Sequence, residues 1–316
     1  MCRPNEILVR VHATTVTRGE LTWAETYYTE LPLLGHDLAG TVVKVPSGDT
    51  KVDGDKRFKP GDEVYGMFGF SKGSTWAELS TARVDQLAIK PRSLSWTESA
   101  AVPLSALTAW QALFEKAGVT EPDFASLAEA GSQGKFPAHG SKKILVTGAN
   151  GAVGTFLVQL AALAGLEVTG LTKSKQRDET FLKSLGAHKV LEYDELWTAG
   201  TTYDIIIDTV GGKILDNCWS VVGEEGLIIS VESSSVDFVR RHREERFHEG
   251  KEGVHTLFFI VATSGKQLEK ITAAFDLGLL KVFVAQEFLL QEAKLAYDVA
   301  NGRLPGRGKV VISVAC

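Results

Sequence analysis

The chain has 316 residues, long enough for two packed domains, and its 44% hydrophobic and 23% charged content is ordinary for a soluble globular protein. A formal net charge of -5 gives no support to a nucleic-acid or membrane-surface partner. Three cysteines, Cys2, Cys218 and Cys316, are too few and too dispersed for a disulfide framework or a four-thiolate zinc site, so we expect a reducing compartment, the cytoplasm.

Short runs rich in β-branched residues fill the first hundred positions. Residues 6–13 (EILVRVHA), 38–45 (LAGTVVKV) and 62–68 (DEVYGMF) are separated by turn sequences such as PSGD and KPGD. This pattern predicts a barrel-like β domain. Residues 97–118 are predicted to be helical, and residues 120–140, rich in small and turn-forming residues, to be a surface insertion or linker.

From Lys142 onward, apolar strand patterns alternate with helix patterns over short connections, which predicts a doubly wound parallel sheet. The stretch from Ile144 to Leu166 contains no charged residue and is long enough to resemble a membrane span. The sequence TGANG near its start would break a continuous helix. We therefore expect a buried strand, turn and helix, because a sheet covered on both faces produces such apolar runs.

The turn in this stretch, GANGAVG at 148–154, has the spacing of a phosphate-binding loop. Gly151 allows a tight turn whose backbone N–H groups approach a phosphate, and Gly154 allows the next helix to pack against the strand. Ala149 stands where many such loops have glycine. The helix expected from about Ala152 points its positive end at the bound anion, which indicates dinucleotide binding.

The end of the second predicted strand bears on which dinucleotide is bound. An NAD site carries an acidic residue there for the ribose 2′-hydroxyl, whereas residues 168–177 contain no acid. Their cations and hydroxyls could instead bind a 2′-phosphate, so the sequence favours NADPH; a solvated basic turn is the alternative. The residues concerned are Thr172, Lys173, Ser174, Lys175 and Arg177.

Several motifs follow one another along the chain: LLGHDLAGTVVKV, KPGDEVYGM, AAVPLSALTAWQALF, ILVTGANGAVGTFLVQLA, YDIIIDTVGG and GRGKVVISV. In content and order, they resemble the medium-chain dehydrogenase/reductase superfamily, specifically its zinc-independent quinone oxidoreductase and enoyl reductase branch. The resemblance spans nearly the whole chain and implies an α/β fold. It places a GroES-like β domain with a shortened N-terminus at residues 1–112 and 279–316, and a Rossmann doubly wound parallel sheet at 113–278.

The resemblance also implies a set of cofactor-binding positions around a nicotinamide held between the two domains. Thr108 would contact the nicotinamide side, and Lys309 of the closing Gly-Lys would lie beside the cleft. The pyrophosphate loop would be Ala149, Asn150, Gly151, Ala152 and Val153; Thr172, Lys173, Lys175 and Arg177 would surround the 2′-phosphate; and Val210, Gly211, Ser230 and Phe259 would line the cofactor channel.

The zinc-dependent alcohol dehydrogenases of this superfamily hold catalytic zinc through Cys, His and Cys. The matching positions in this sequence are Thr17, His36 and Leu104, so two of the three ligands are missing, and a lone histidine cannot hold Zn²⁺. We therefore expect no metal. Without a Lewis acid, the hydride acceptor must already be electrophilic: a quinone, an enone or an enoyl thioester.

Candidate catalytic residues follow from the resemblance less firmly than the cofactor residues do. Tyr27 and Tyr28 fall where some enoyl reductases of this branch place a proton-donating tyrosine, although aromatic packing and donation by water are the alternatives. Thr17 stands where many quinone reductases have asparagine beside the nicotinamide.

Three functions remain open. The first is an NADPH-dependent reductase of a small conjugated carbonyl compound or quinone. The second is a stand-alone enoyl reductase of a polyketide-type pathway, whose substrate is bound to a carrier protein. The third is a reductase-like protein that binds NADPH without turnover. By analogy with relatives we expect a homodimer, and no nucleic acid or membrane partner.

Overall fold

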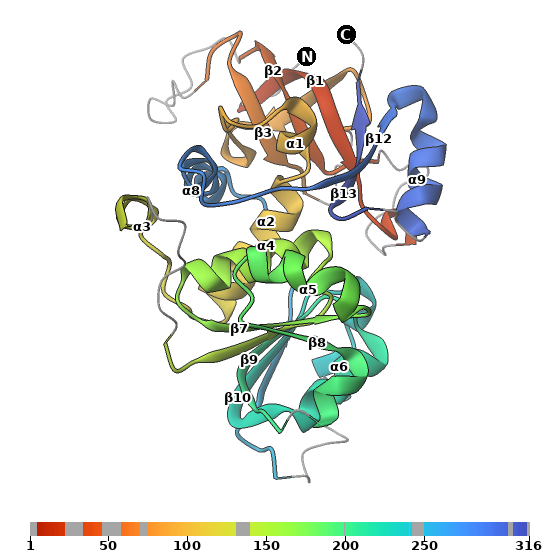
Figure 1. The fold of residues 1–316 in the computed structure, drawn as a ribbon. Helices are drawn as coiled ribbons and strands as arrows, with labels where there is room; N and C mark the ends of the chain where they lie inside the picture. Colours follow the sequence, from red (N-terminus) through yellow and green to blue (C-terminus); the bar gives the residue numbers. More distant parts are fainter. Residues whose placement is uncertain are drawn as a thin grey trace. The chain divides into compact units, whose positions relative to one another are not determined.

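The computed structural model describes residues 5–22, 34–45, 58–69, 75–130, 140–198, 200–239, 241, 250–302 and 306–314. The chain divides into two compact units. The first combines Met1–Leu107 with Ala262–Cys316, and the second is Thr108–Val261. Each unit contains its own β-sheet, and both are drawn in Figure 1.

The sheet of the first unit is built around one long strand. Strand β1 (Glu6–Val16) pairs antiparallel with three partners, β13, β2 and β4. Its alternate residues Ile7, Val9 and Val11 are buried, as the period of a half-buried strand requires. The sheet runs β12-β13-β1-β2-β3-β5, its other strands being β2 (Asp37–Lys44), β3 (Glu63–Met67), β4 (Leu79–Arg83), β5 (Leu87–Ile89), β12 (Val284–Leu289) and β13 (Lys309–Ser313).

The described helices of the first unit are α1 (Trp96–Ala100), α8 (Gly265–Asp276) and α9 (Ala293–Asn301), and α2 (Pro103–Trp110) begins in this unit and ends in the second. Helix α1 begins with a reciprocal cap in which the Glu98 amide donates to Ser95 Oγ and the Ser95 amide donates to Glu98 Oε2. A π-helical turn, Gln111–Lys116, continues α2.

The observed division of the chain differs from the predicted one. The predicted boundary at residue 278 assigned α8 to the Rossmann domain, whereas the structure groups it with the first unit. The reason is packing against the β unit. Tyr65 donates a hydrogen bond of 2.9 Å to the Leu268 carbonyl, and a Cβ on Gly265 would lie 2.3 Å from the Leu87 carbonyl oxygen. The other boundary falls after Leu107 instead of residue 112.

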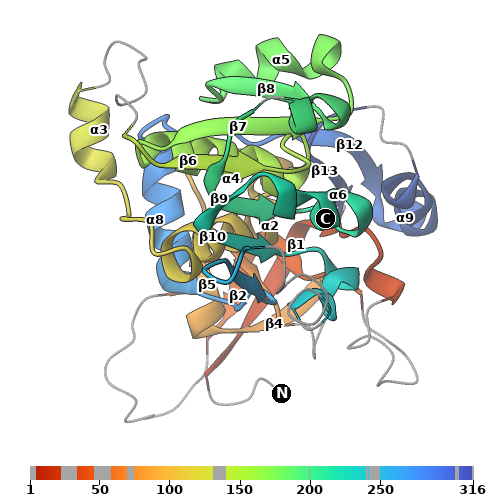
Figure 2. The same ribbon diagram turned by 90° about the horizontal axis from the view of Figure 1, so that it is seen from below.

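The second unit is a six-stranded parallel sheet in the order β11-β10-β9-β6-β7-β8 (Figure 1 and Figure 2). Numbered within the unit, this order read from β8 is 3-2-1-4-5-6, the Rossmann arrangement, so the predicted doubly wound fold is confirmed. The strands are β6 (Lys143–Val146), β7 (Glu167–Thr172), β8 (Lys189–Glu192), β9 (Tyr203–Asp208), β10 (Val222–Ser230) and β11 (His255–Phe258), and the helices are α3 (Phe124–Ala130), α4 (Ala152–Leu163), α5 (Lys175–Ser184) and α6 (Gly212–Asn217).

The centre of this sheet is fully enclosed. Ile144, Leu145 and Val146 of β6 have no exposed surface, nor do Ile206 and Ile207 of β9. Strand order reverses between these two strands. In sheets of this kind, ligands bind at the carboxyl ends of the strands beside the reversal point. Within the residues described, no helix is long and apolar enough to cross a membrane.

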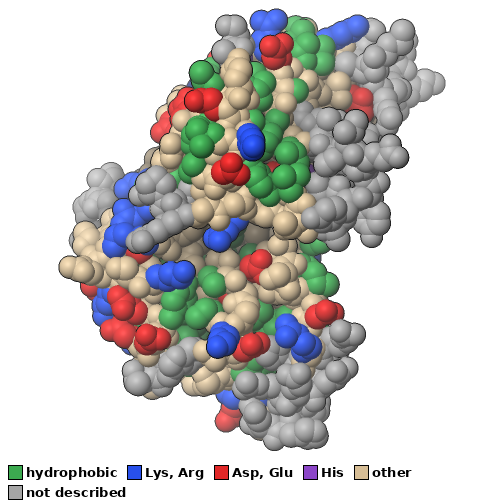
Figure 3. Space-filling view, turned by 90° about the vertical axis from the view of Figure 1, so that its right-hand side faces the viewer, with side chains coloured by type: hydrophobic (Ala, Val, Ile, Leu, Met, Phe, Trp, Pro, Cys, Tyr) green, Lys and Arg blue, Asp and Glu red, His purple; other side chains and the backbone are tan. Residues whose placement is uncertain are grey.

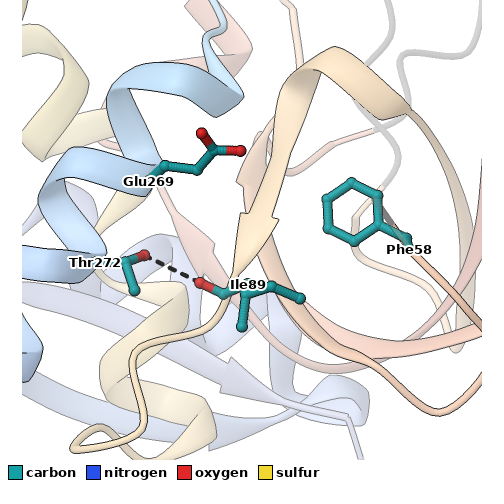
Figure 4. Close-up of a pocket in the computed structure, with 4 residues that line it drawn as sticks. All are labelled: Phe58, Ile89, Glu269 and Thr272. Atoms are coloured by element: carbon teal, nitrogen blue, oxygen red, sulfur yellow. Dashed lines mark hydrogen bonds between the residues drawn. The ribbon is translucent and has the colours of Figure 1, made fainter. Parts of the chain in front are cut away.

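The surface carries charges of both signs. In Figure 3, Lys and Arg side chains lie among Asp and Glu side chains over the described part of the face shown. A cavity of about 140 Å³ is found in the first unit (Figure 4), lined by Phe58, Ile89, Glu269 and Thr272. The Thr272 hydroxyl donates to the Ile89 carbonyl at 3.0 Å, so this cavity lies where α8 joins β5. It contains none of the predicted site residues.

The contact between α8 and the β unit gives a stability prediction. Tyr65 is fully buried, and its hydroxyl binds the Leu268 carbonyl and lies 2.9 Å from Thr272 Oγ1. We expect Tyr65→Phe to lower the free energy of unfolding by about 1 kcal/mol or more, because buried polar groups lose a partner. Chemical denaturation measures this, with Tyr297→Phe as the control, since the Tyr297 hydroxyl accepts a 3.3 Å bond from the exposed Leu21 amide. Equal effects of the two substitutions would contradict the assignment.

Candidate functional site

The glycine-rich turn after β6 is held in a conformation that side chains would obstruct. Gly148 has a φ of 59°, and a Cβ there would lie 2.5 Å from Thr209 Oγ1. A Cβ on Gly154 would lie 2.2 Å from the Gly148 carbonyl oxygen, so the first turn of α4 packs directly on the turn that precedes it. The close approach predicted for Gly154 is therefore present. A larger residue at Gly154 would push α4 away from the turn, and one at Gly148 would collide with Thr209.

The N-terminus of α4 opens on this turn. Gly151 is the N-cap residue, and no side chain caps the helix. The first amides of the helix, those of Ala152 and Val153, have no intrahelical partners, and the dipole of a 12-residue helix adds partial positive charge there. This cradle fits a phosphate or pyrophosphate, which a bound nicotinamide dinucleotide would supply.

A buried carboxylate organises the neighbouring strand ends. Asp208, the last residue of β9, accepts hydrogen bonds from Thr147 Oγ1 at 2.6 Å and from Ser230 Oγ at 3.0 Å. It also accepts the amides of Val210 at 3.2 Å and Gly211 at 3.0 Å. Burial raises the pKa of Asp208, whereas these four donors oppose the shift. The predicted channel residues Val210, Gly211 and Ser230 are thus brought together by one side chain.

Two other predicted cofactor residues lie apart from this network. Thr108 is buried in α2, with 5% of its surface exposed. Phe259 directly follows β11 and is half-buried, and the Lys116 ammonium lies 5.6 Å from the centre of its ring. That contact is a cation–π pair, and it gives Phe259 a structural role.

The basic turn after β7 is less cationic than its sequence indicates. Lys175 forms an ion pair of 3.5 Å with Glu195, and Arg177 is paired with Asp178. Lys173 is exposed and has no ion-pair partner in the described part of the chain. The expectation of three unpaired cations therefore needs correction, because Lys175 and the half-exposed Arg177 are each paired with a carboxylate outside residues 168–177.

Asp178 is the functional candidate that sequence reasoning missed. It lies in the first turn of α5, has no exposed surface, and accepts from Thr172 Oγ1 at 2.6 Å and Asn150 Nδ2 at 3.0 Å. Arg177 adds two hydrogen bonds of 2.9 Å through Nε and Nη2. Asp178 thus joins the glycine loop to the basic turn. In the sequence, Asp178 directly follows residues 168–177, and the first turn of α5 brings it back to the end of β7.

The first unit contains a second buried polar cluster at the end of β1. Lys309 Nζ lies 2.5 Å from Asp37 Oδ2, 3.1 Å from Thr15 Oγ1 and 3.4 Å from Thr17 Oγ1. Thr15 Oγ1 donates to Asp37 Oδ2 at 2.6 Å, and Leu104 N donates to Asp37 Oδ1 at 2.7 Å. The three N–H bonds of the ammonium thus face three acceptors. The Thr17 hydroxyl is the last group of this hydrogen-bonded cluster, and Thr17 is half-buried.

The positions that match zinc ligands do not fit a zinc ion. Leu104 offers no donor side chain, and Thr17 is a poor ligand beside a lysine ammonium. His36 Nε2 lies 3.3 Å from Glu20 Oε1, which also accepts the Gly35 amide at 2.6 Å. In the described residues no group of three or more His, Cys, Asp or Glu side chains is arranged to hold a metal.

Glu20 and His36 are in contact as uncharged groups and not as an ion pair. Burial raises the pKa of Glu20 to about 7 and lowers the pKa of His36 to about 4. Both shifts disfavour charge, so between these pH values the carboxyl is protonated and the imidazole neutral. Tyr27 and Tyr28, predicted as proton donors, lie outside the described residues.

Known proteins resemble the chain over its whole length. A family model described as alcohol dehydrogenase GroES-like domain matches residues 3–92, and one described as zinc-binding dehydrogenase matches 185–312. A protein of Arthroderma benhamiae named "Probable zinc-binding oxidoreductase, mitochondrial" is 35% identical over 321 residues, which cover 98% of this chain and 88% of that protein.

Two further similarities extend the comparison. The protein of Danio rerio named "NAD(P)H oxidoreductase RTN4IP1, mitochondrial" is 25% identical over 362 residues, covering 98% of this chain and 84% of its own. The structure of a quinone oxidoreductase from Coxiella burnetii superposes with a TM-score of 0.79 at 25% identity, covering 100% of this chain and 92% of that one.

The ion pair between Lys309 and Asp37 gives a stability prediction. Their side chains are 6% and 0% exposed, so Lys309→Met would leave a buried carboxylate without its cation. We expect this change to destabilise the protein by about 3–5 kcal/mol. Adding Asp37→Asn should recover much of the loss, because the buried charge is then gone. Urea denaturation tests both, and a double variant as unstable as Lys309→Met would contradict the ion-pair account.

The raised pKa of Glu20 gives a prediction about pH. The Glu20 carboxyl has a pKa of about 7 in the folded protein and an ordinary value of 4.5. Its contribution to the stability of the folded state is therefore fully present below pH 4.5 and is lost as the pH rises toward 7. Glu20→Gln removes this loss, so the stability of the variant minus that of the wild type should rise from pH 4.5 to 7. Denaturation at several pH values measures this difference in the free energy of unfolding, in which the contributions of other titrating groups cancel. A constant difference would contradict the shift.

Proposed function

Because the chain belongs to the medium-chain dehydrogenase/reductase superfamily, in its quinone oxidoreductase branch, we propose that it is an NADPH-dependent, zinc-independent reductase of quinones or α,β-unsaturated carbonyl compounds. The observation that carries the proposal is the uncapped N-terminus of α4, packed on a glycine turn at the reversal point of a Rossmann sheet. Relatives named as NAD(P)H and quinone oxidoreductases support the same reaction class.

The dinucleotide would span the carboxyl edge of the parallel sheet. Its pyrophosphate would bind the amides of Ala152 and Val153, because the Gly151 amide already donates to the Gly148 carbonyl at 2.9 Å. Its adenosine end would lie beyond β7, where the exposed Lys173 and the half-exposed Arg177 favour a 2′-phosphate. The half of the cofactor that carries the nicotinamide would follow the backbone that Asp208 fixes at Val210 and Gly211. When bound, NADPH supplies the hydride.

The residues at the end of β1 support a reaction without zinc. Lys309 donates to Thr17 Oγ1, so the hydroxyl hydrogen of Thr17 remains to be donated, and no acceptor for it occurs in the described residues. We propose that Thr17 donates this hydrogen bond to the oxygen of a conjugated acceptor, where negative charge develops as hydride arrives. The buried Lys309 adds positive charge behind the hydroxyl. An acceptor that is already electrophilic needs no stronger assistance.

The proposed function is tested by following NADPH oxidation at 340 nm with purified protein. A quinone, an enone and an enoyl thioester would each serve as acceptor, with the thioester offered free and on a carrier protein. Turnover of the free quinone or enone is expected. Turnover only of the carrier-bound thioester would favour a pathway enoyl reductase, and NADPH binding without oxidation of any acceptor would contradict the proposed enzyme.

Thr17→Val tests the proposed catalytic hydroxyl. The substitution preserves the shape of the side chain and removes its donor, so we expect kcat with an enone to fall about 10–100-fold while the Kd for NADPH stays unchanged. Thr17→Ser, which keeps the hydroxyl, should retain most of the activity. A Thr17→Val enzyme with full kcat would contradict the role of Thr17.

A further inference from the structure

An acidic side chain lies at the end of the second Rossmann strand, although the last residues of that strand contain no acid. Asp178 reaches this place from α5: its Oδ2 lies 2.6 Å from the hydroxyl of Thr172, the last residue of β7, and 3.0 Å from Asn150 Nδ2 in the glycine loop. In Rossmann proteins that bind NAD, a carboxylate at the end of this strand accepts the ribose 2′-hydroxyl.

This carboxylate is covered. Arg177 Nε donates to Oδ1 and Arg177 Nη2 to Oδ2, both at 2.9 Å. The Asp178 side chain has no exposed surface, whereas that of Arg177 is 53% exposed. The guanidinium therefore lies on the solvent side of the acid, and the turn presents a cation where it would otherwise present an anion.

We infer that the Arg177–Asp178 pair decides which nicotinamide dinucleotide binds, with Arg177 shielding a ribose-binding acid and offering its own charge to the 2′-phosphate. This inference rests on the proposed function, in which a dinucleotide occupies the glycine loop. With Arg177 in place, a ribose hydroxyl cannot reach Asp178. Without it, the uncovered carboxylate would accept the 2′-hydroxyl of NADH and repel the 2′-phosphate of NADPH.

The exposed lysine of the turn, Lys173, has a different expected effect. It has no ion-pair partner among the described residues, so Lys173→Ala should weaken NADPH binding and leave NADH binding as it was. A gain in NADH affinity is therefore specific to removal of Arg177. It should also require Asp178, which makes the effect testable by a double substitution.

The experiment measures the Kd of NADPH and of NADH by calorimetry for the wild type, Arg177→Ala, Arg177→Ala with Asp178→Asn, and a control. Lys183→Ala is the matched control, because Lys183 belongs to an exposed 2.8 Å ion pair with Glu179 on the same helix. We expect Arg177→Ala to weaken NADPH at least about tenfold and to tighten NADH several-fold, the scale of a charge-assisted hydrogen bond. The double variant should lose the gain in NADH, and the control should change neither value.

Each outcome bears on a separate statement. A wild type that binds neither nucleotide, or shows no preference for NADPH, contradicts the proposed cofactor and the inference with it. A wild type that prefers NADPH, with an Arg177→Ala variant that gains no NADH affinity, overturns the shielding role alone. So does a gain that persists in the double variant. Arg177→Gln provides the same comparison should the alanine variant not fold.

Discussion

The candidate cofactor site depends on how closely α4 approaches the turn after β6. Gly148 and Gly154 bring the helix so near that a methyl group on Gly154 would overlap the Gly148 carbonyl. Because β6 is enclosed on both faces, the strand cannot move to relieve such overlap. The free amides of α4 are therefore held at the carboxyl edge of the sheet, and Asp208 fixes the neighbouring loop beside them. The proposed pyrophosphate site follows from this packing.

Much of this arrangement could be predicted from the sequence because it depends on local patterns. The apolar run from Ile144 to Leu166 indicated a buried strand and helix, and α4 does begin at Ala152. The alternation after Lys142 indicated the parallel sheet, and the glycine spacing located the turn. Each of these features is determined by neighbours within a few residues, so no knowledge of distant contacts was needed.

Contacts between distant residues could not be predicted in this way. The sequence of the basic turn showed three cations, but not that Asp178 would fold back to Thr172 and engage Arg177. Lys309 was expected near the cofactor, and the structure shows that its ammonium faces Asp37 and Thr15, which lie 272 and 294 positions earlier in the chain. The packing of α8 against β3 and β5 shifted the domain boundary for the same reason: the contact is long-range.

The two ion pairs with a buried carboxylate have related consequences. In each, a cation lies against a carboxylate with no exposed surface, and the hydroxyl of a strand residue donates to that carboxylate. In the proposed complex, Asp178 and Arg177 would set the charge at the adenosine end of the cofactor. Lys309, paired with Asp37, donates to Thr17 Oγ1 and would leave the hydroxyl hydrogen of Thr17 to be donated. Cofactor choice and catalysis without zinc would thus both rest on how a buried charge is neutralised.

Transfer of an isotopic label tests the central claim most directly. NADPH carrying deuterium at the transferable position would be incubated with the protein and a simple enone, and the product examined by mass spectrometry and NMR. The account predicts oxidation of the nucleotide and deuterium at the β-carbon of the saturated ketone. Unreacted enone, or a product without label at that carbon, would contradict it.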